Sequence, residues 1–221
     1  MFSNMPPVTK ALLIANGLVF LLQLLLGEAT FTPFELWPLG SGGDAYAATG
    51  MFLPWQLVTY AFLHDPNNIF HLLFNMLALV MFGSPLEHTW GNRRFATYYF
   101  VCVIGAGLCQ LAVTSWIVAH GGGVGATIGA SGGIFGLLFA YGMLFPNQRV
   151  MLLIPPIPMK ARTLVFVYGA IELFLGVTGT QQGVAHFAHL GGMLFGWMLI
   201  RYWRGQPPFG RRGPPRPRIV R

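Results

Sequence analysis

Six polar side chains interrupt otherwise apolar stretches of this sequence. In chain order they are His71, Asn75, Ser131, Glu172, His186 and His189. Polar residues in such stretches are costly to bury and usually functional. Together they supply a hydroxyl nucleophile, imidazole bases and hydrogen-bond donors, which are the groups that acyl transfer needs. For Glu172 the residues alone suggest only a buried hydrogen bond.

Ser131 lies where a helix is expected to begin, within Gly129-Ala130-Ser131-Gly132-Gly133. An uncapped helix start offers free N–H groups and a partial positive charge, which suits an anion forming there. Runs of small residues are also ordinary close-packing surfaces in membrane helices. Taken alone, the motif therefore leaves a packing role for Ser131 open.

His186 and His189 are candidate bases, and as a pair they are candidate metal ligands. We expect no metal, because no His-Glu-x-x-His motif occurs and Glu172, the only nearby carboxylate, has no evident partner in the sequence. Helical geometry separates the two histidines. His189 lies about 40° from the centre of a small-residue stripe on its helix, and His186 about 100° from it.

Matching stripes of small residues predict that two helical stretches approach closely. Their members are Ala185, Gly192 and Gly196 in the last stretch and Gly132, Gly136 and Ala140 in the stretch that Ser131 opens. The stripes predict proximity of the two helices but do not aim the Ser131 hydroxyl.

His71 and Asn75 are four residues apart, so they share one helix face. Both side chains can donate hydrogen bonds to an oxyanion, and a plain helix–helix hydrogen bond explains the pair equally well. No aspartate is placed to orient a histidine. The set therefore predicts a Ser131–His189 dyad, a variant of the nucleophile–base arrangement.

The composition places these residues in a membrane. Of 221 residues 54% are hydrophobic and 9% are charged, whereas a soluble domain carries roughly a quarter charged residues. Continuous apolar runs near the ~20 residues that cross a bilayer predict an all-α membrane protein with six transmembrane helices and no barrel. The expected helices span 8–26, 69–86, 95–118, 127–145, 162–178 and 184–203. They form one domain, residues 1–204, in which the first run is retained rather than cleaved.

Basic residues fix the expected orientation. With the N-terminus inside, all 13 Lys and Arg residues fall on the inner side, so both termini are expected to be cytosolic. We expect the plasma (inner) membrane as the host. The net charge of +7 follows from this asymmetry and does not indicate nucleic-acid binding. The Pro-rich tail, residues 205–221, is expected to be disordered, with binding to anionic lipid as the alternative.

Two segments do not fit simple spans. The outer connection 28–68 is long and rich in aromatic residues, which favours a functional element lying partly in the membrane interface. Residues 121–129 are too rich in glycine for a regular helix in lipid. Because irregular backbone at this depth must border protein or water, we expect a wet cavity that ends at Ser131.

The sequence resembles the rhomboid family over roughly residues 8–203. The motifs that carry the resemblance are His71-x-x-x-Asn75, Gly129-Ala130-Ser131-Gly132, Ala188-His189-Leu190-Gly191-Gly192, Trp55-Gln56 and Glu87-x-x-Trp90-Gly91. The resemblance implies a rhomboid-like bundle and an intramembrane serine endopeptidase acting on single-span transmembrane proteins, without cofactor or metal.

The same resemblance assigns roles to residues. Ser131 would be the nucleophile and His189 the base, while His71, Asn75 and the Ser131 amide would surround the oxyanion. The site also takes in three neighbours, Gly129, Ala130 and Phe135. Two departures stand out. Gln56 replaces an arginine, and Phe135, at an aromatic position that is often tyrosine, lacks the hydroxyl group.

Two other classes of function use the same cavity. A small transporter or channel would carry solute there, although no paired intramembrane carboxylates and no inverted repeat are evident. A non-catalytic chaperone would bind client helices in the same groove. Covalent labelling of Ser131 separates both from a protease.

Overall fold

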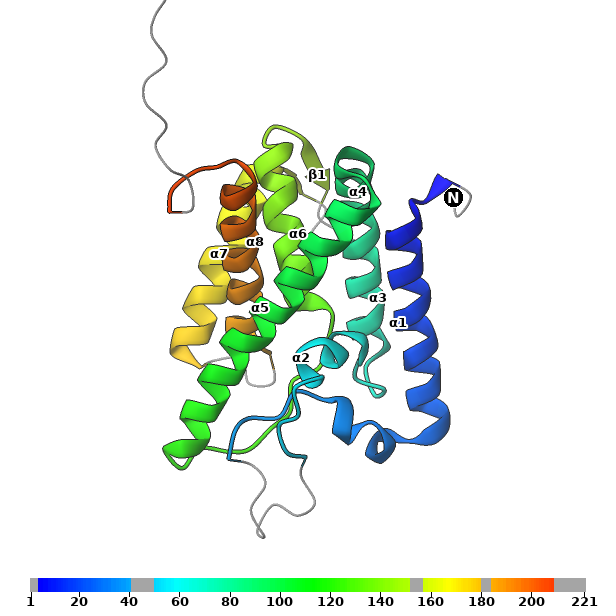
Figure 1. The fold of residues 1–221 in the computed structure, drawn as a ribbon, viewed down its shortest axis with the longest axis vertical. Helices are drawn as coiled ribbons and strands as arrows, with labels where there is room; N and C mark the ends of the chain where they lie inside the picture. Colours follow the sequence, from blue (N-terminus) through cyan, green and yellow to red (C-terminus); the bar gives the residue numbers. More distant parts are fainter. Residues whose placement is uncertain (1–3, 41–49, 152–156, 180–183, 209–221) are drawn as a thin grey trace, which may run out of the picture.

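Long helices make up most of the structure, which is a computed structural model describing residues 4–40, 50–151, 157–179 and 184–208. They pack side by side into one bundle (Figure 1). The long helices are α1 (Pro7–Leu26), α3 (Ile69–Ala78), α5 (Asn92–Ala119), α6 (Ser131–Leu144), α7 (Ala161–Thr178) and α8 (His186–Trp203). A π-helical turn, η6 (Leu79–Gly83), joins α3 to α4 (Ser84–Trp90), so that the three form one continuous path.

Four of these paths are long and apolar enough to cross a membrane. Within the described residues they are Pro7–Leu26, Ile69–Trp90, Asn92–Ala119 and Ala161–Thr178. The other two expected spans differ from the rest. Helix α6 is apolar but has only 14 residues, and α8 carries two histidines and Arg201 in its 18 residues. The fold is thus a predominantly helical membrane bundle in which Ser131, His186 and His189 lie on the two least typical helices.

The expected helix at 127–145 begins only at Ser131, since the glycine-rich segment before it does not form helix. A two-stranded antiparallel sheet, which the sequence did not predict, lies in the connection between α6 and α7. It pairs β1 (Arg149–Met151) with β2 (Pro158–Lys160), with Arg149 opposite Lys160. These short strands pair residues 149–151 with residues 158–160, and hydropathy alone does not reveal the pairing.

Helices α6 and α8 approach so closely that their backbones meet. A Cβ atom at Gly192 would overlap the carbonyl oxygen of Gly132, and one at Gly136 would overlap the Cys102 side chain of α5. The Tyr98 hydroxyl of α5 donates a hydrogen bond to the Gly136 carbonyl oxygen, 2.9 Å away. The close approach predicted from the small-residue stripes is therefore present, and it places Ser131 beside α8.

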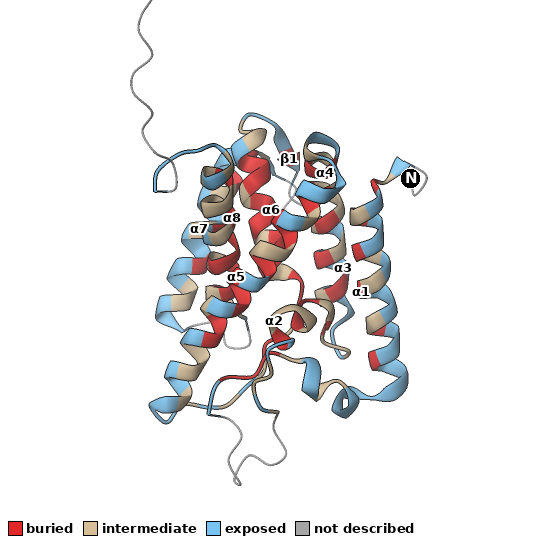
Figure 2. Cartoon of the chain, viewed as in Figure 1, coloured by how far each residue is buried: buried red, intermediate tan, exposed pale blue. Residues whose placement is uncertain are grey.

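The burial pattern suits a lipid environment. Buried residues line the inner faces of α5, α6 and α8, whereas α1 and α7 carry exposed faces (Figure 2). Large apolar side chains such as Leu25, Phe166 and Val177 are exposed on these two peripheral helices. In water such a surface would be unfavourable, but in lipid it costs nothing.

A carboxylate fixes the beginning of α1. Glu87 is buried in α4, and its carboxylate oxygens accept hydrogen bonds from the Val8 and Thr9 amides, at 2.8 and 2.7 Å, and from the Thr9 hydroxyl. These bonds satisfy free N–H groups at the start of the helix and place negative charge at its positive end. Glu87 thereby joins the first helix to the remainder of the bundle.

The outer connection folds over the end of the bundle as short helical turns. They are η2 (Glu28–Thr30), η3 (Thr32–Phe34), α2 (Gln56–Thr59) and η5 (Tyr60–Phe62). The Gln56 side chain is fully buried among them; it accepts a hydrogen bond from the Trp37 amide and donates to the carbonyl oxygens of Pro33 and Met51. A neutral side chain thus anchors the connection at the position where the resemblance expects arginine.

This connection also contacts the segment before α6. Leu36 and Thr127 form an isolated antiparallel bridge, with N···O distances of 3.0 and 2.9 Å. In addition, the Gly129 amide donates to the Tyr60 carbonyl oxygen at 2.9 Å. The non-helical backbone that precedes Ser131 is therefore paired with protein, as backbone at this depth must be.

Candidate active site

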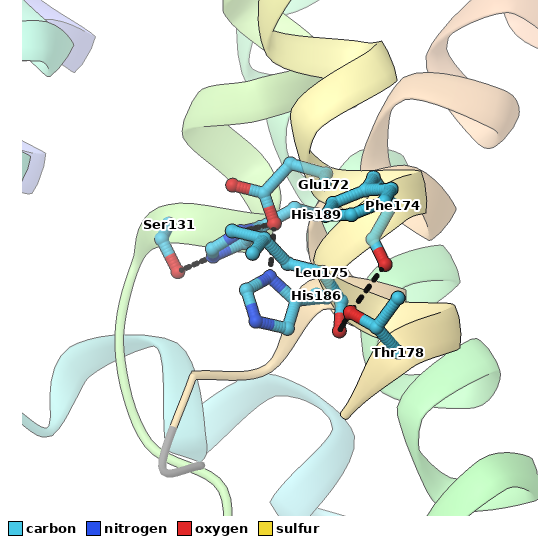
Figure 3. A network of polar contacts seen from close by, with 7 residues as sticks. All are labelled: Ser131, Glu172, Phe174, Leu175, Thr178, His186 and His189. Carbon is cyan, nitrogen blue, oxygen red and sulfur yellow. Dashed lines mark hydrogen bonds and ion pairs between the residues drawn. The ribbon is translucent and has the colours of Figure 1, made fainter. Parts of the chain in front are cut away.

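Ser131 is the first residue of α6, and no side chain caps the helix there. Its hydroxyl oxygen lies 2.8 Å from Nε2 of His189 on α8 (Figure 3). This is hydrogen-bonding distance between a nucleophile and a base. The close packing of α6 on α8 brings the two side chains together, although 58 residues separate them in the chain.

Phe135, one turn after Ser131, fixes the plane of the His189 ring. The two rings are stacked, with centroids 4.1 Å apart and an angle of 5° between their planes. Offset stacking of this kind restricts tilting of the imidazole. Phe135 does this without the hydroxyl group of a tyrosine.

Glu172 of α7 also belongs to the site, which the sequence analysis did not predict. Its Oε2 atom lies 2.6 Å from Nδ1 of His186 and 2.9 Å from Nδ1 of His189. The first contact is a hydrogen bond, whereas the second is within ion-pair distance but less well aligned. The sequence suggested a buried hydrogen bond for Glu172 without an evident partner, and the structure supplies the two histidines of α8 as its partners.

A signal for this placement was present in α7. Gly169, Glu172 and Gly176 follow at spacings of three and four residues, so they share one helix face. A Cβ atom at Gly176 would lie 3.2 Å from the Cβ atom of His186. The two glycines thus mark the face of α7 that meets α8, and the carboxylate between them points at the histidines.

His71 lies on the opposite side of Ser131. Its Nδ1 atom accepts a hydrogen bond from the Asp65 amide at 3.3 Å, so the neutral ring carries its proton on Nε2. That nitrogen faces Gly129: a Cβ atom there would lie 2.8 Å from His71 Nε2 and 3.8 Å from the Ser131 hydroxyl. A donor thus faces the space beside the nucleophile.

Asn75 is less directly placed. Its side-chain amide donates to the His71 carbonyl oxygen, one turn earlier on the same helix, at 2.7 Å. One amide hydrogen is used in this way and a second remains for another acceptor. Ala130 is fully buried and immediately precedes the helix that Ser131 begins.

A cavity of about 1040 Å³ reaches Ser131 and His189. His71 and Asn75 line its polar part together with these two residues. The remaining wall is largely apolar and comes from several elements, among them α3 with Phe70 and Phe74, α6 with Leu138, and α7 with Leu164 and Tyr168. The opening expected at Ser131 is present, and it extends along two helices that face lipid.

Burial shifts the pKa values of His64 and Glu35 in the outer connection. Burial, together with the nearby His71, lowers the pKa of His64 to about 3, so this ring stays neutral where it packs against His71. Burial, together with Glu28, raises the pKa of Glu35 to about 7. The connection over the cavity therefore changes charge near neutral pH at Glu35 and not at His64.

The fold and this site define a helical membrane protein with a serine–histidine pair at the end of a deep cavity. The family model described as Rhomboid domain matches residues 52–205. The chain belongs to the rhomboid family.

Named relatives agree with this assignment. RHOMBOID-like protein 1 of Arabidopsis thaliana is 31% identical over 71% of this chain and 36% of its own length. Rhomboid protein 1, mitochondrial, of Saccharomyces cerevisiae is 31% identical over 66% of this chain and 42% of its own length. Rhomboid-like protease 3 of Toxoplasma gondii is 29% identical over 73% of this chain and 56% of its own length. The chain thus matches between about a third and just over half of each relative.

Proposed function

We propose that this chain is an intramembrane serine endopeptidase that cleaves transmembrane segments of membrane proteins through a Ser131–His189 dyad. The observation that carries the proposal is the 2.8 Å contact between the Ser131 hydroxyl and His189 Nε2, at the end of a cavity bordered by lipid-facing helices. The name of the Toxoplasma gondii relative, a rhomboid-like protease, supports the same activity.

In the proposed reaction His189 removes the Ser131 proton as the hydroxyl attacks the scissile carbonyl. The developing oxyanion accepts hydrogen bonds from His71 Nε2, the Asn75 amide and the Ser131 backbone amide, and the positive end of α6 stabilises it further. His189 then gives the proton to the leaving amine. Water from the cavity hydrolyses the acyl-enzyme, with the same histidine accepting and returning a proton.

The cavity walls favour a single-span transmembrane protein as substrate. An intact helix hides its peptide bonds, so the segment must unwind before Ser131 can reach a carbonyl carbon. The apolar walls from α3 and α7 suit side chains that come from lipid, and the polar end suits an exposed peptide bond. We expect small residues and helix breakers near the cleaved bond. The proposal requires membrane lipid around the bundle, and no metal, cofactor or nucleic acid.

We further propose six membrane crossings with both termini in the cytosol of a plasma (inner) membrane. Placement of all 13 basic residues on one side supports this orientation. Relatives with mitochondrial names show that the family also occupies other membranes, so the host membrane needs a direct test.

A fluorophosphonate probe tests the activity without knowledge of the substrate. We expect covalent labelling of the wild-type protein in membranes, and loss of labelling in Ser131→Ala and in His189→Ala. The His186→Ala variant should still be labelled. An unlabelled wild-type protein that is folded would instead favour a transporter or a binding protein, and loss of labelling in His186→Ala alone would make His186 the base.

A further inference from the structure

Glu172 is a buried carboxylate that the dyad does not use. It is 7% exposed, in the middle of α7, and both of its contacts are histidines of α8. In Figure 3 its carboxylate lies next to His189 and His186, while Ser131 lies on the opposite side of His189. A charge in such a place is costly to bury unless it is paired.

We infer that Glu172 is a positioning residue: it holds His189 with the proton on Nδ1, so that the Nε2 lone pair faces the Ser131 hydroxyl. The inference rests on the proposed function and deepens it from a dyad to a carboxylate–histidine–serine arrangement. A carboxylate only accepts hydrogen bonds, so the nearby Nδ1 must carry a hydrogen to interact favourably with it.

The stacking of Phe135 on His189 cannot by itself fix which ring nitrogen faces Ser131 or which nitrogen carries the proton. A rotation of the imidazole by 180° about its bond to Cβ keeps the ring in the same plane but exchanges its nitrogens for carbons. The stack would accept both orientations, and also both positions of the proton. Glu172, 2.9 Å from Nδ1, favours the ring orientation that turns Nδ1 toward it and the tautomer that carries the proton on Nδ1.

This geometry determines where the protons lie in the first step of the proposed reaction. The Ser131 proton moves to Nε2, while Nδ1 keeps its own proton and Glu172 stays ionised. The ring becomes positively charged next to a carboxylate, which stabilises that state. His186 shares the same Oε2 atom through the shorter 2.6 Å contact, and His71 is the other titratable neighbour of His189. The effect of Glu172 should therefore be smaller than the ~10⁴-fold effect of the carboxylate in a fully aligned triad.

The test compares two replacements of a buried carboxylate by an amide of the same shape. Because both histidines contact the same oxygen atom, Glu172→Gln either keeps a neutral and weaker acceptor there or turns its N–H₂ group toward both rings, which favours the unproductive tautomer of His189. We expect its fluorophosphonate labelling rate to fall at least about tenfold, and the inflection of the rate–pH profile to move. Glu87→Gln, which affects the start of α1, should lower thermal stability and leave both the rate and the profile unchanged.

The outcomes separate the positioning role from the activity itself. A labelled wild-type protein with an equally reactive Glu172→Gln variant would overturn the positioning role and leave the protease in place. Failure of wild-type labelling would overturn the proposed function first. A rate loss in Glu172→Gln with an unchanged pH profile, accompanied by a lower melting temperature, would make Glu172 merely structural.

A divalent metal ion is the rival for the same three side chains. The ligand atoms of Glu172, His186 and His189 lie within 4.8 Å of one another, and two histidines with one glutamate form a known zinc set. Metal analysis of the purified wild-type protein should find no stoichiometric zinc, and EDTA should not change the labelling rate. Zinc that is bound by the wild type and lost in Glu172→Gln would overturn the positioning role.

Discussion

At the scale of single residues, the two histidines beside Ser131 each have a neighbour at Nδ1, which is the ring nitrogen away from Ser131. The Asp65 amide occupies Nδ1 of His71 and leaves Nε2 as a donor. On the other side of Ser131, Nε2 of His189 must instead be an acceptor. Under the proposed mechanism the site therefore uses two histidines with opposite tautomers, each favoured by a neighbour of its Nδ1 atom.

The His71 donor can be removed with little change of shape. In His71→Phe we expect kcat to fall by about 10²–10³-fold, a loss of about 2.7–4 kcal/mol of transition-state stabilisation, because the oxyanion loses one donor. The measurement is turnover of a model transmembrane substrate in vesicles. A drop confined to KM would instead assign His71 to substrate binding.

Glu35 should make the stability of the outer connection depend on pH. Its folded-state pKa of about 7 exceeds the ordinary value of 4.5, so the folded protein holds this proton more tightly than the unfolded chain. The stabilisation is present below pH 4.5 and is lost as the pH rises through 7. Melting temperatures measured at pH 5 and pH 8 should differ less in Glu35→Gln than in wild type, whereas equal differences would contradict the assignment.

Much of this residue-level arrangement could be predicted from the sequence. The nearness of the helices that carry Ser131 and His189 followed from the small-residue stripes, and the angles to the stripe favoured His189 over His186. The shared helix face of His71 and Asn75 followed from their spacing. Glu172 was missed, because a contact between α7 and α8 depends on the rotation of both helices about their axes. The hydrophobic pattern does not determine that rotation in lipid, where both faces are apolar.

At the scale of elements, the contact between α6 and α8 depends on the absence of side chains. Gly192 lies against the Gly132 carbonyl oxygen, where no Cβ atom fits. The sequence predicted this closeness, because small residues recur at helical spacing in both elements. It did not predict the β1–β2 pairing, whose three-residue strands are too short to show a pattern.

Adding one methyl group at this contact should separate the helices. In Gly192→Ala we expect a loss of stability of about 1–3 kcal/mol or more, because the backbone of α6 must move away. Activity should fall with it, since Ser131 moves with α6. Gly17→Ala is the matched control: α1 has open space at that position, so stability should not fall. Thermal unfolding in detergent measures both, and equal melting temperatures would contradict the packing argument.

At the scale of the whole molecule, the apolar faces and the charge distribution together predict an orientation. His88 at the end of α4 and His120 after α5 are both exposed, at opposite ends of the bundle. The proposed topology puts His88 in the cytosol and His120 outside. Hydropathy and charge sufficed for this prediction, since both are properties of long segments.

Single cysteines at these positions test the orientation. With Cys102 and Cys109 replaced by alanine, His120→Cys should react with a membrane-impermeant maleimide in intact cells. His88→Cys should react only after the cells are opened. The reverse pattern would invert the molecule and place its cavity on the cytosolic side.

The short length of α6 has a consequence for where a substrate is cut. Its 14 residues rise about 21 Å, so Ser131 lies at a fixed distance from the opposite end of the helix, which the proposed topology places at the cytosolic side. Under the proposed activity, the distance of a peptide bond from the cytosolic side of the membrane determines whether it is cleaved. Lengthening a substrate span at its outer end should leave the cleaved bond unchanged, whereas lengthening it at its inner end should displace the cut by the same number of residues.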